Sequence, residues 1–107
     1  MILLRPFQSP ATEASLTEAV RSALGRRLKN YPWSFEASVE GSVRPLTQDT
    51  CVLSAFLVDR ASGSVIAAVR SRDRSGDARR IAEAFASSAE AAFSRFSQDG
   101  AAGMRPT

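Results

Sequence analysis

The residue types in this 107-residue chain exclude the most common catalytic arrangements. The chain contains no histidine, so a Ser-His-Asp triad, a Cys-His pair and an imidazole metal ligand are all ruled out within it. Glu36 and Glu40 lie at alternating positions of a predicted strand, where paired carboxylates can support acid-base chemistry. Two carboxylates on an exposed strand face are far more often a solvated surface. We therefore predict a non-enzymatic protein without a metal, a cofactor or a small-molecule substrate.

The segment 70–80 is the strongest charged feature of the chain. Arginines at this density bind the phosphates of nucleic acids or an acidic protein surface. Two aspartates lie among them, and alternating signs weaken the long-range field, which favours a solvated and locally paired turn. Nucleic-acid binding is therefore the alternative function, and its candidate residues are Arg70, Arg72, Arg74, Arg79 and Arg80.

Tyr31 and Trp33 form an aromatic pair in a predicted loop. Exposed tyrosine and tryptophan side chains anchor partner proteins because they combine a large contact area with a polar group. The favoured interpretation is that Trp33 folds over the end of the preceding helix and covers the core, since tryptophan buries so much surface. Both residues are nevertheless candidates for partner binding.

Three consecutive strands are predicted between Phe35 and Arg72. In the first, apolar and polar residues alternate, which is typical of a strand with one buried and one solvated face. The predicted solvated set is Glu36, Ser38, Glu40, Ser42 and Arg44, of which Glu36, Glu40 and Arg44 are candidates for partner binding. The run 51–58 is apolar on both faces apart from Ser54, as in the interior strand of a sheet. The turn 59–64 contains Gly63, which tolerates positive φ.

Helical patterns flank these strands. A short strand over 2–7 precedes a helix that begins near Ser15, and a second helix follows Asp77, a plausible N-cap. Three phenylalanines lie on the apolar stripe of the second helix and must pack on the sheet. The predicted fold is an α+β two-layer sandwich of order β-α-β-β-β-α, with a mainly antiparallel sheet and both helices on one face.

The chain reads as one domain over 1–97, followed by a tail over 98–107 that has no apolar period and is predicted to be flexible. Its net charge of +3 is a weak indication of an anionic partner. Cys51 is the one cysteine, so no internal disulfide forms, and we expect it to be buried. The opening apolar run is too short for a signal peptide or a membrane span. The protein is thus predicted to be cytoplasmic or a trimmed mature domain.

Four stretches, 2–7, 15–20, 39–44 and 57–65, resemble the pattern of bacterial envelope accessory domains. In those domains, the ABC-type transport auxiliary lipoproteins and TolB-type amino-terminal domains, a short strand precedes an L-T-E-A helix, an E-G-S-V strand and an L-[IV]-D-x-x-[ST]-G-x-V hairpin. The closing helix fits the first group better. Such domains usually carry more chain before the E-G-S-V strand, where only 30–34 intervene here, and this chain has no lipobox cysteine. The resemblance implies an accessory role and a periplasmic or outer-membrane-associated location.

The leading hypothesis is therefore a non-catalytic protein-interaction or assembly domain, in keeping with an envelope transport system. Its partner would be another protein or a second copy of the chain, bound through the polar sheet face, an unpaired sheet edge or the Tyr31 and Trp33 loop. Nucleic acid is the less favoured partner. The order helix, three strands, helix also resembles double-stranded RNA-binding domains, but the segment 77–80 matches their lysine-rich helix start only loosely.

Overall fold

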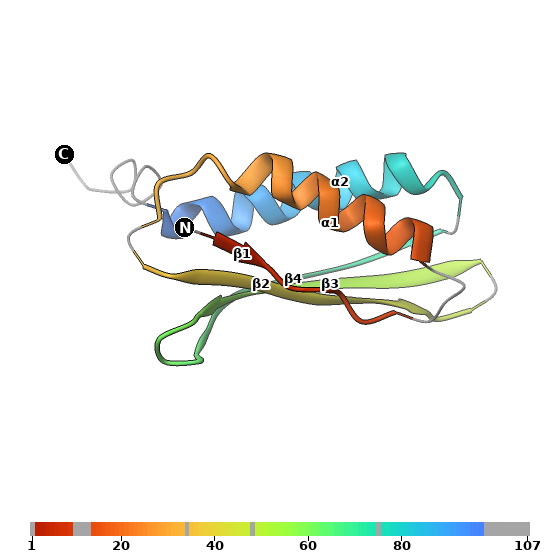
Figure 1. The fold of residues 1–107 in the computed structure, drawn as a ribbon. Helices are drawn as coiled ribbons and strands as arrows, with labels where there is room; N and C mark the ends of the chain where they lie inside the picture. The colour runs from red at the N-terminus through yellow and green to blue at the C-terminus, as the bar shows by residue number, and fades with distance from the viewer. Residues whose placement is uncertain (1, 10–13, 34, 48, 75, 98–107) are drawn as a thin grey trace.

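The computed structural model describes residues 2–9, 14–33, 35–47, 49–74 and 76–97 (Figure 1). Within them the chain forms one four-stranded sheet and two α-helices in the predicted order β-α-β-β-β-α. Both helices lie on the same side of the sheet, so the predicted α+β layout is confirmed. The predicted tail at 98–107 lies outside the described residues. The elements are β1 (Ile2–Leu4), α1 (Ala14–Leu28), β2 (Ala37–Pro45), β3 (Thr50–Asp59), β4 (Val65–Arg74), α2 (Ala78–Phe93) and the 3-10 helix η2 (Ser94–Phe96).

The strands lie in the order β1-β2-β3-β4, with an antiparallel meander over the last three. β1 pairs in parallel with β2 and ends at Leu4, earlier than the predicted end at residue 7. Pro6 explains the difference because it has no amide hydrogen to donate to a neighbouring strand. Pairing resumes at Gln8, whose amide donates to the Gly41 carbonyl (3.0 Å) and whose carbonyl accepts from the Val43 amide (2.9 Å).

The core lies between the sheet and the two helices. Alternate residues of β2 and β3 face the helices, among them Val39, Leu53 and Leu57, and all three are fully buried. The apolar stripe of α2 packs against them, with Phe93 fully buried and Phe85 nearly so. Burying one such side chain contributes about 1.5–3 kcal/mol. Further fully buried residues are Val20, Leu24, Leu28, Val43 and Cys51, the last as expected from the sequence.

The start of α2 follows the prediction as well. The carboxylate of Asp77 accepts a hydrogen bond from the Arg79 amide at 3.1 Å, which satisfies one of the unpaired donors at the helix start. No helix in the described part of the chain is long and apolar enough to cross a membrane.

Ser38 lies on the same strand face as Glu40 and Arg44, as predicted, but the prediction that it is solvated was wrong. Only 1% of this residue is exposed, although its neighbours along the same face, Glu40 and Arg44, are exposed. The register accounts for the difference, since Ser38 lies between Leu3 of β1 and Val58 of β3. Arg44 has no β1 partner beside it, because β1 ends at Leu4.

Gly41 marks the closest approach within the sheet layer. A Cβ atom at this position would lie 2.2 Å from the Ser54 carbonyl oxygen and 2.7 Å from the ring of Phe7. A side chain is therefore excluded by neighbouring backbone that cannot move without disturbing β3. Gly63 serves a different purpose, because its φ of 76° lies in the left-handed region that the β3–β4 turn requires.

Replacing Gly41 with alanine is expected to lower the free energy of unfolding by about 2–3 kcal/mol, because the new methyl group overpacks a rigid site. Gly76→Ala is the matched control, since a Cβ there meets no atom within 4 Å, and its effect should stay within about 0.5 kcal/mol. Urea denaturation followed by circular dichroism measures both. Equal stability of the two variants would contradict the close contact.

Candidate partner-binding surface

The face of the sheet opposite the helices, called the open face below, brings predicted site residues from separate strands together. Arg44 of β2 and Arg72 of β4 lie in register on either side of Val52 in β3. With strands about 4.8 Å apart, the two arginine Cα atoms are about 10 Å from each other. By register and alternation, the open face carries Arg5, Glu40, Ser42, Arg44, Val52, Ser54, Phe56, Arg70, Arg72 and Arg74.

Two adjoining hollows of about 500 and 620 Å³ lie on this surface and share three lining residues, Arg44, Val52 and Arg70. The first extends over Phe56 and Ser54 towards Arg5, and the second extends over Leu46 and Arg72. On this face, apolar side chains of β3 thus lie between arginines of β2 and arginines of β4. Such a surface suits a partner that carries both apolar and acidic side chains.

The acidic residues nearest the open face are already paired. Glu40 lies 3.6 Å from the Arg5 Nε atom, and Glu36 lies 4.0 Å from Arg60. Glu36 and Glu40 are four residues apart on extended chain, about 13 Å, so they do not share a proton site. By contrast, the arginine cluster makes no ion pair with any acidic side chain in the described ranges; it consists of Arg44, Arg70, Arg72 and Arg74. Its guanidinium donors are therefore available to a partner.

The arginine-rich segment 70–80 is divided between two surfaces. Arg70, Arg72 and Arg74 lie on the open face of β4, whereas Arg79 and Arg80 begin α2 on the helix side. Arg80 is 3.9 Å from the carboxylate of Asp73, which points to the helix side of β4. The five candidate residues for nucleic-acid binding consequently do not form one continuous basic surface.

Trp33 lies over the end of α1, as the favoured interpretation predicted. Its indole nitrogen donates to the Leu28 carbonyl at 3.2 Å, and its ring packs edge-on against Phe35 at a centroid distance of 6.0 Å. Tyr31 lies 6.3 Å away from Trp33 by ring centroid. Both side chains are half-buried against the core, and their role in partner binding stays a prediction.

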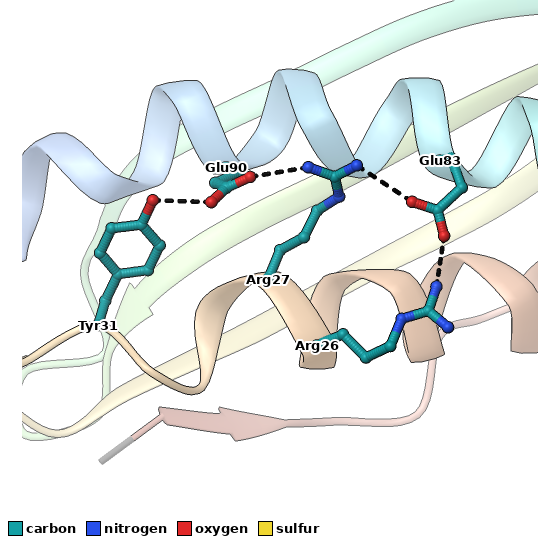
Figure 2. A network of polar contacts seen from close by, with 5 residues as sticks. All are labelled: Arg26, Arg27, Tyr31, Glu83 and Glu90. Carbon is teal, nitrogen blue, oxygen red and sulfur yellow. Dashed lines mark hydrogen bonds and ion pairs between the residues drawn. The ribbon is translucent and has the colours of Figure 1, made fainter.

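Tyr31 also ends a polar network that joins the two helices (Figure 2). Its hydroxyl donates to Glu90 at 2.7 Å, and Arg27 of α1 lies between Glu90 (2.9 Å) and Glu83 (3.1 Å) of α2. Arg26 makes a further ion pair with Glu83. The network therefore bridges α1, α2 and the loop after α1.

The hydrogen bonds of the network shift the pKa values of Glu90 and Arg27. The pKa of Glu90 is lowered from its ordinary value, first by the hydrogen bond from Tyr31 and then by that from Arg27. The pKa of Arg27 is raised, mainly by its hydrogen bonds to Glu90 and then to Glu83. Both shifts favour the charged forms of Arg27 and Glu90, as expected for a structural ion pair.

The sequence interpretation missed Arg5, Gln8 and Ser54 as lining residues of the open face. Arg5 and Gln8 reach it because β1 runs parallel to β2, a pairing that the pattern of β1 does not specify. Ser54 was the polar exception in the apolar run 51–58. That exception was the signal from which its place on the open face could have been inferred.

Comparison with known proteins supports the fold. No protein-family model matches this chain, and no match was found among curated proteins. One solved structure that is similar to it is that of a "putative lipoprotein" from Caulobacter crescentus CB15. The TM-score is 0.52 and the sequence identity 16%, and the match covers 80% of this chain and 86% of the other. At this identity the likeness establishes a shared fold.

Replacing Glu90 with glutamine should destabilise the protein by about 0.5–1 kcal/mol at pH 7, because glutamine cannot pair with Arg27 as a charge and solvent screens a pair this exposed. The folded-state pKa of Glu90 is depressed, so its contribution is present above the unfolded-state pKa, near 4.5, and is lost as the pH falls through the folded-state value. Urea melts at pH 7 and pH 3 should show the difference from wild type shrinking at the lower pH.

Glu18→Gln is the control for that measurement. Glu18 is an exposed residue of α1 that makes no ion pair with the described residues, so its replacement should leave stability nearly unchanged at both pH values. A Glu90→Gln effect that is the same at pH 3 and pH 7 would show that the ionised carboxylate does not stabilise the helix pair.

Proposed function

We propose that this chain is a non-catalytic interaction domain that binds a protein partner across the open face of its sheet. The observation that carries the proposal is the composition of this face, where arginines of β2 and β4 that make no ion pair with the described residues flank apolar residues of β3. Core packing does not require this combination, because the core lies on the other side of the sheet. Arginine and exposed aromatic or aliphatic residues are typical of protein interfaces.

The division of labour between the two layers supports the same function. Four charged residues at the contact between the two helices, Arg26, Arg27, Glu83 and Glu90, are engaged with one another. On the open face, by contrast, the arginine cluster has no acidic partner in the described part of the chain. We therefore assign partner binding to the open face and a structural role to the outer helix surface.

The proposed setting is the bacterial envelope, in an accessory or assembly role for a transport system. Two observations support it: the resemblance to envelope accessory domains in 2–7, 15–20, 39–44 and 57–65, and the fold shared with a bacterial protein described as a "putative lipoprotein". In this setting the domain is periplasmic or associated with the outer membrane.

Site-specific photo-crosslinking in the native cell tests the function. A benzoylphenylalanine placed at Ser42 or Val52 of the open face should give the same discrete protein adduct, found in the envelope fraction. The same probe at Ser87, on the exposed side of α2, is the matched control and should give none. Arg44→Glu should weaken the adduct from Val52 at least fivefold.

Two results would overturn the proposal. The first is the absence of an adduct from either position of the open face while the folded protein is present at normal levels. The second is an adduct that nuclease treatment removes, because this would identify a nucleic acid as the molecule bound at the arginine cluster.

A further inference from the structure

β4 leaves one of its two edges without a strand neighbour among the described residues. The strand is ten residues long and pairs only with β3. None of its residues is fully buried, in contrast to β2 and β3. Its outward amide and carbonyl groups therefore form a template on which another extended segment can add.

The side chains along this edge differ between its two halves. In the second half, Arg70, Arg72 and Arg74 alternate on the open face, about 7 Å apart, and make no ion pair with a described acidic residue. In the first half, a hollow of about 510 Å³ lies between β4 and the end of α2. It is lined mainly by alanines and by Phe96, which is 40% exposed.

We infer that the outer edge of β4 binds an extended acidic segment of the partner protein as a fifth strand. The inference rests on the proposed function and specifies the partner's chemistry. Acidic residues at every second position of an added strand have the same spacing as Arg70, Arg72 and Arg74, and arginine binds carboxylates with two parallel hydrogen bonds. An apolar side chain near one end of the segment fills the hollow beside Phe96.

The charges along the edge favour an acidic protein segment over a second copy of this chain and over a nucleic acid. A second copy that paired β4 with β4 would offer no acidic side chain to Arg70, Arg72 and Arg74 on the open face, and registers that set the two arginine-bearing halves opposite each other are destabilising. A nucleic acid offers no backbone that continues the sheet, and Arg79 and Arg80 lie on the helix side. The edge carries Asp73 on its helix side, so the segment must place its acidic residues on the open face alone.

The test uses a fluorescein-labelled nonapeptide that alternates glutamate with valine and threonine, titrated into the whole protein at 150 mM salt with polarisation as the readout. We expect saturable binding and amide chemical-shift changes concentrated in 65–74. A peptide of the same composition with its glutamates in one block should bind at least tenfold more weakly. Equal binding of the two peptides would overturn the inference.

Backbone methylation distinguishes strand addition from simple charge attraction. Only one edge of the added strand faces β4, and the amide hydrogens of alternate residues point to opposite edges. A peptide N-methylated at its odd-numbered residues and one N-methylated at its even-numbered residues should therefore differ in affinity. One of the two methylated peptides should lose at least tenfold in affinity and the other less than twofold. If both methylated peptides bind as well as the parent peptide, no strand is added and the inference is wrong.

Protein variants identify the arginines involved. Arg72→Glu should weaken binding of the acidic peptide at least tenfold and strengthen binding of a peptide that has lysine in place of glutamate. Arg79→Glu, the matched control on α2, should change the affinity for either peptide by less than twofold. Thermal melts confirm that both variants are folded. Equal losses from both variants, or binding of duplex RNA but not of peptide, would overturn the inference. Failed peptide binding with intact open-face crosslinks would reject this inference and leave the proposed function standing.

Discussion

α1 and α2 cover the same face of a four-stranded sheet, and this one-sided packing is the constraint on which the other features depend. All large apolar side chains of the helices must then meet a single sheet face, where Val39, Leu53 and Leu57 receive them. The two helices must also lie side by side, which brings Arg27 between Glu83 and Glu90. Ion pairs this exposed contribute little stability each. Their importance lies in fixing which parts of the two helices face each other.

The same constraint leaves the opposite sheet face to solvent, yet that face is not uniformly polar. Phe56 and Val52 lie on it as half-buried residues, and Val58 and Ser38 are buried there. Val52, Phe56 and Val58 belong to β3 and Ser38 to β2. Each of these residues has strand neighbours on both sides, which shelter even the side away from the helices. The arginines of the flanking strands complete a surface with an apolar centre and a cationic border.

Much of the fold was predictable from local patterns. Alternation located β2, the apolar run located β3 at the interior, and Asp77 marked the start of α2, because each depends on residues close in sequence. The register of β1 was not predictable, since it depends on a parallel pairing across a helix. The positions of Arg70 and Arg80 show the same dependence on tertiary structure. Both belong to one basic segment of the sequence, but strand alternation and the turn into α2 place them on different layers. The hollow beside Arg44 was likewise hidden, because three strands contribute to it.

The two edges of the sheet are unequal. β1 pairs over only three residues and Pro6 follows two residues later, and both a short edge strand and a proline hinder further strands from joining. β4 extends over ten residues and contains no proline, although its pairing with β3 has one register shift opposite Leu57 and Val58. A sheet that can grow in one direction only cannot propagate, because a second molecule finds nothing to extend on the far side. The strand addition proposed at β4 would therefore end after a single step, which would allow a partner to bind there without opening a route to fibres.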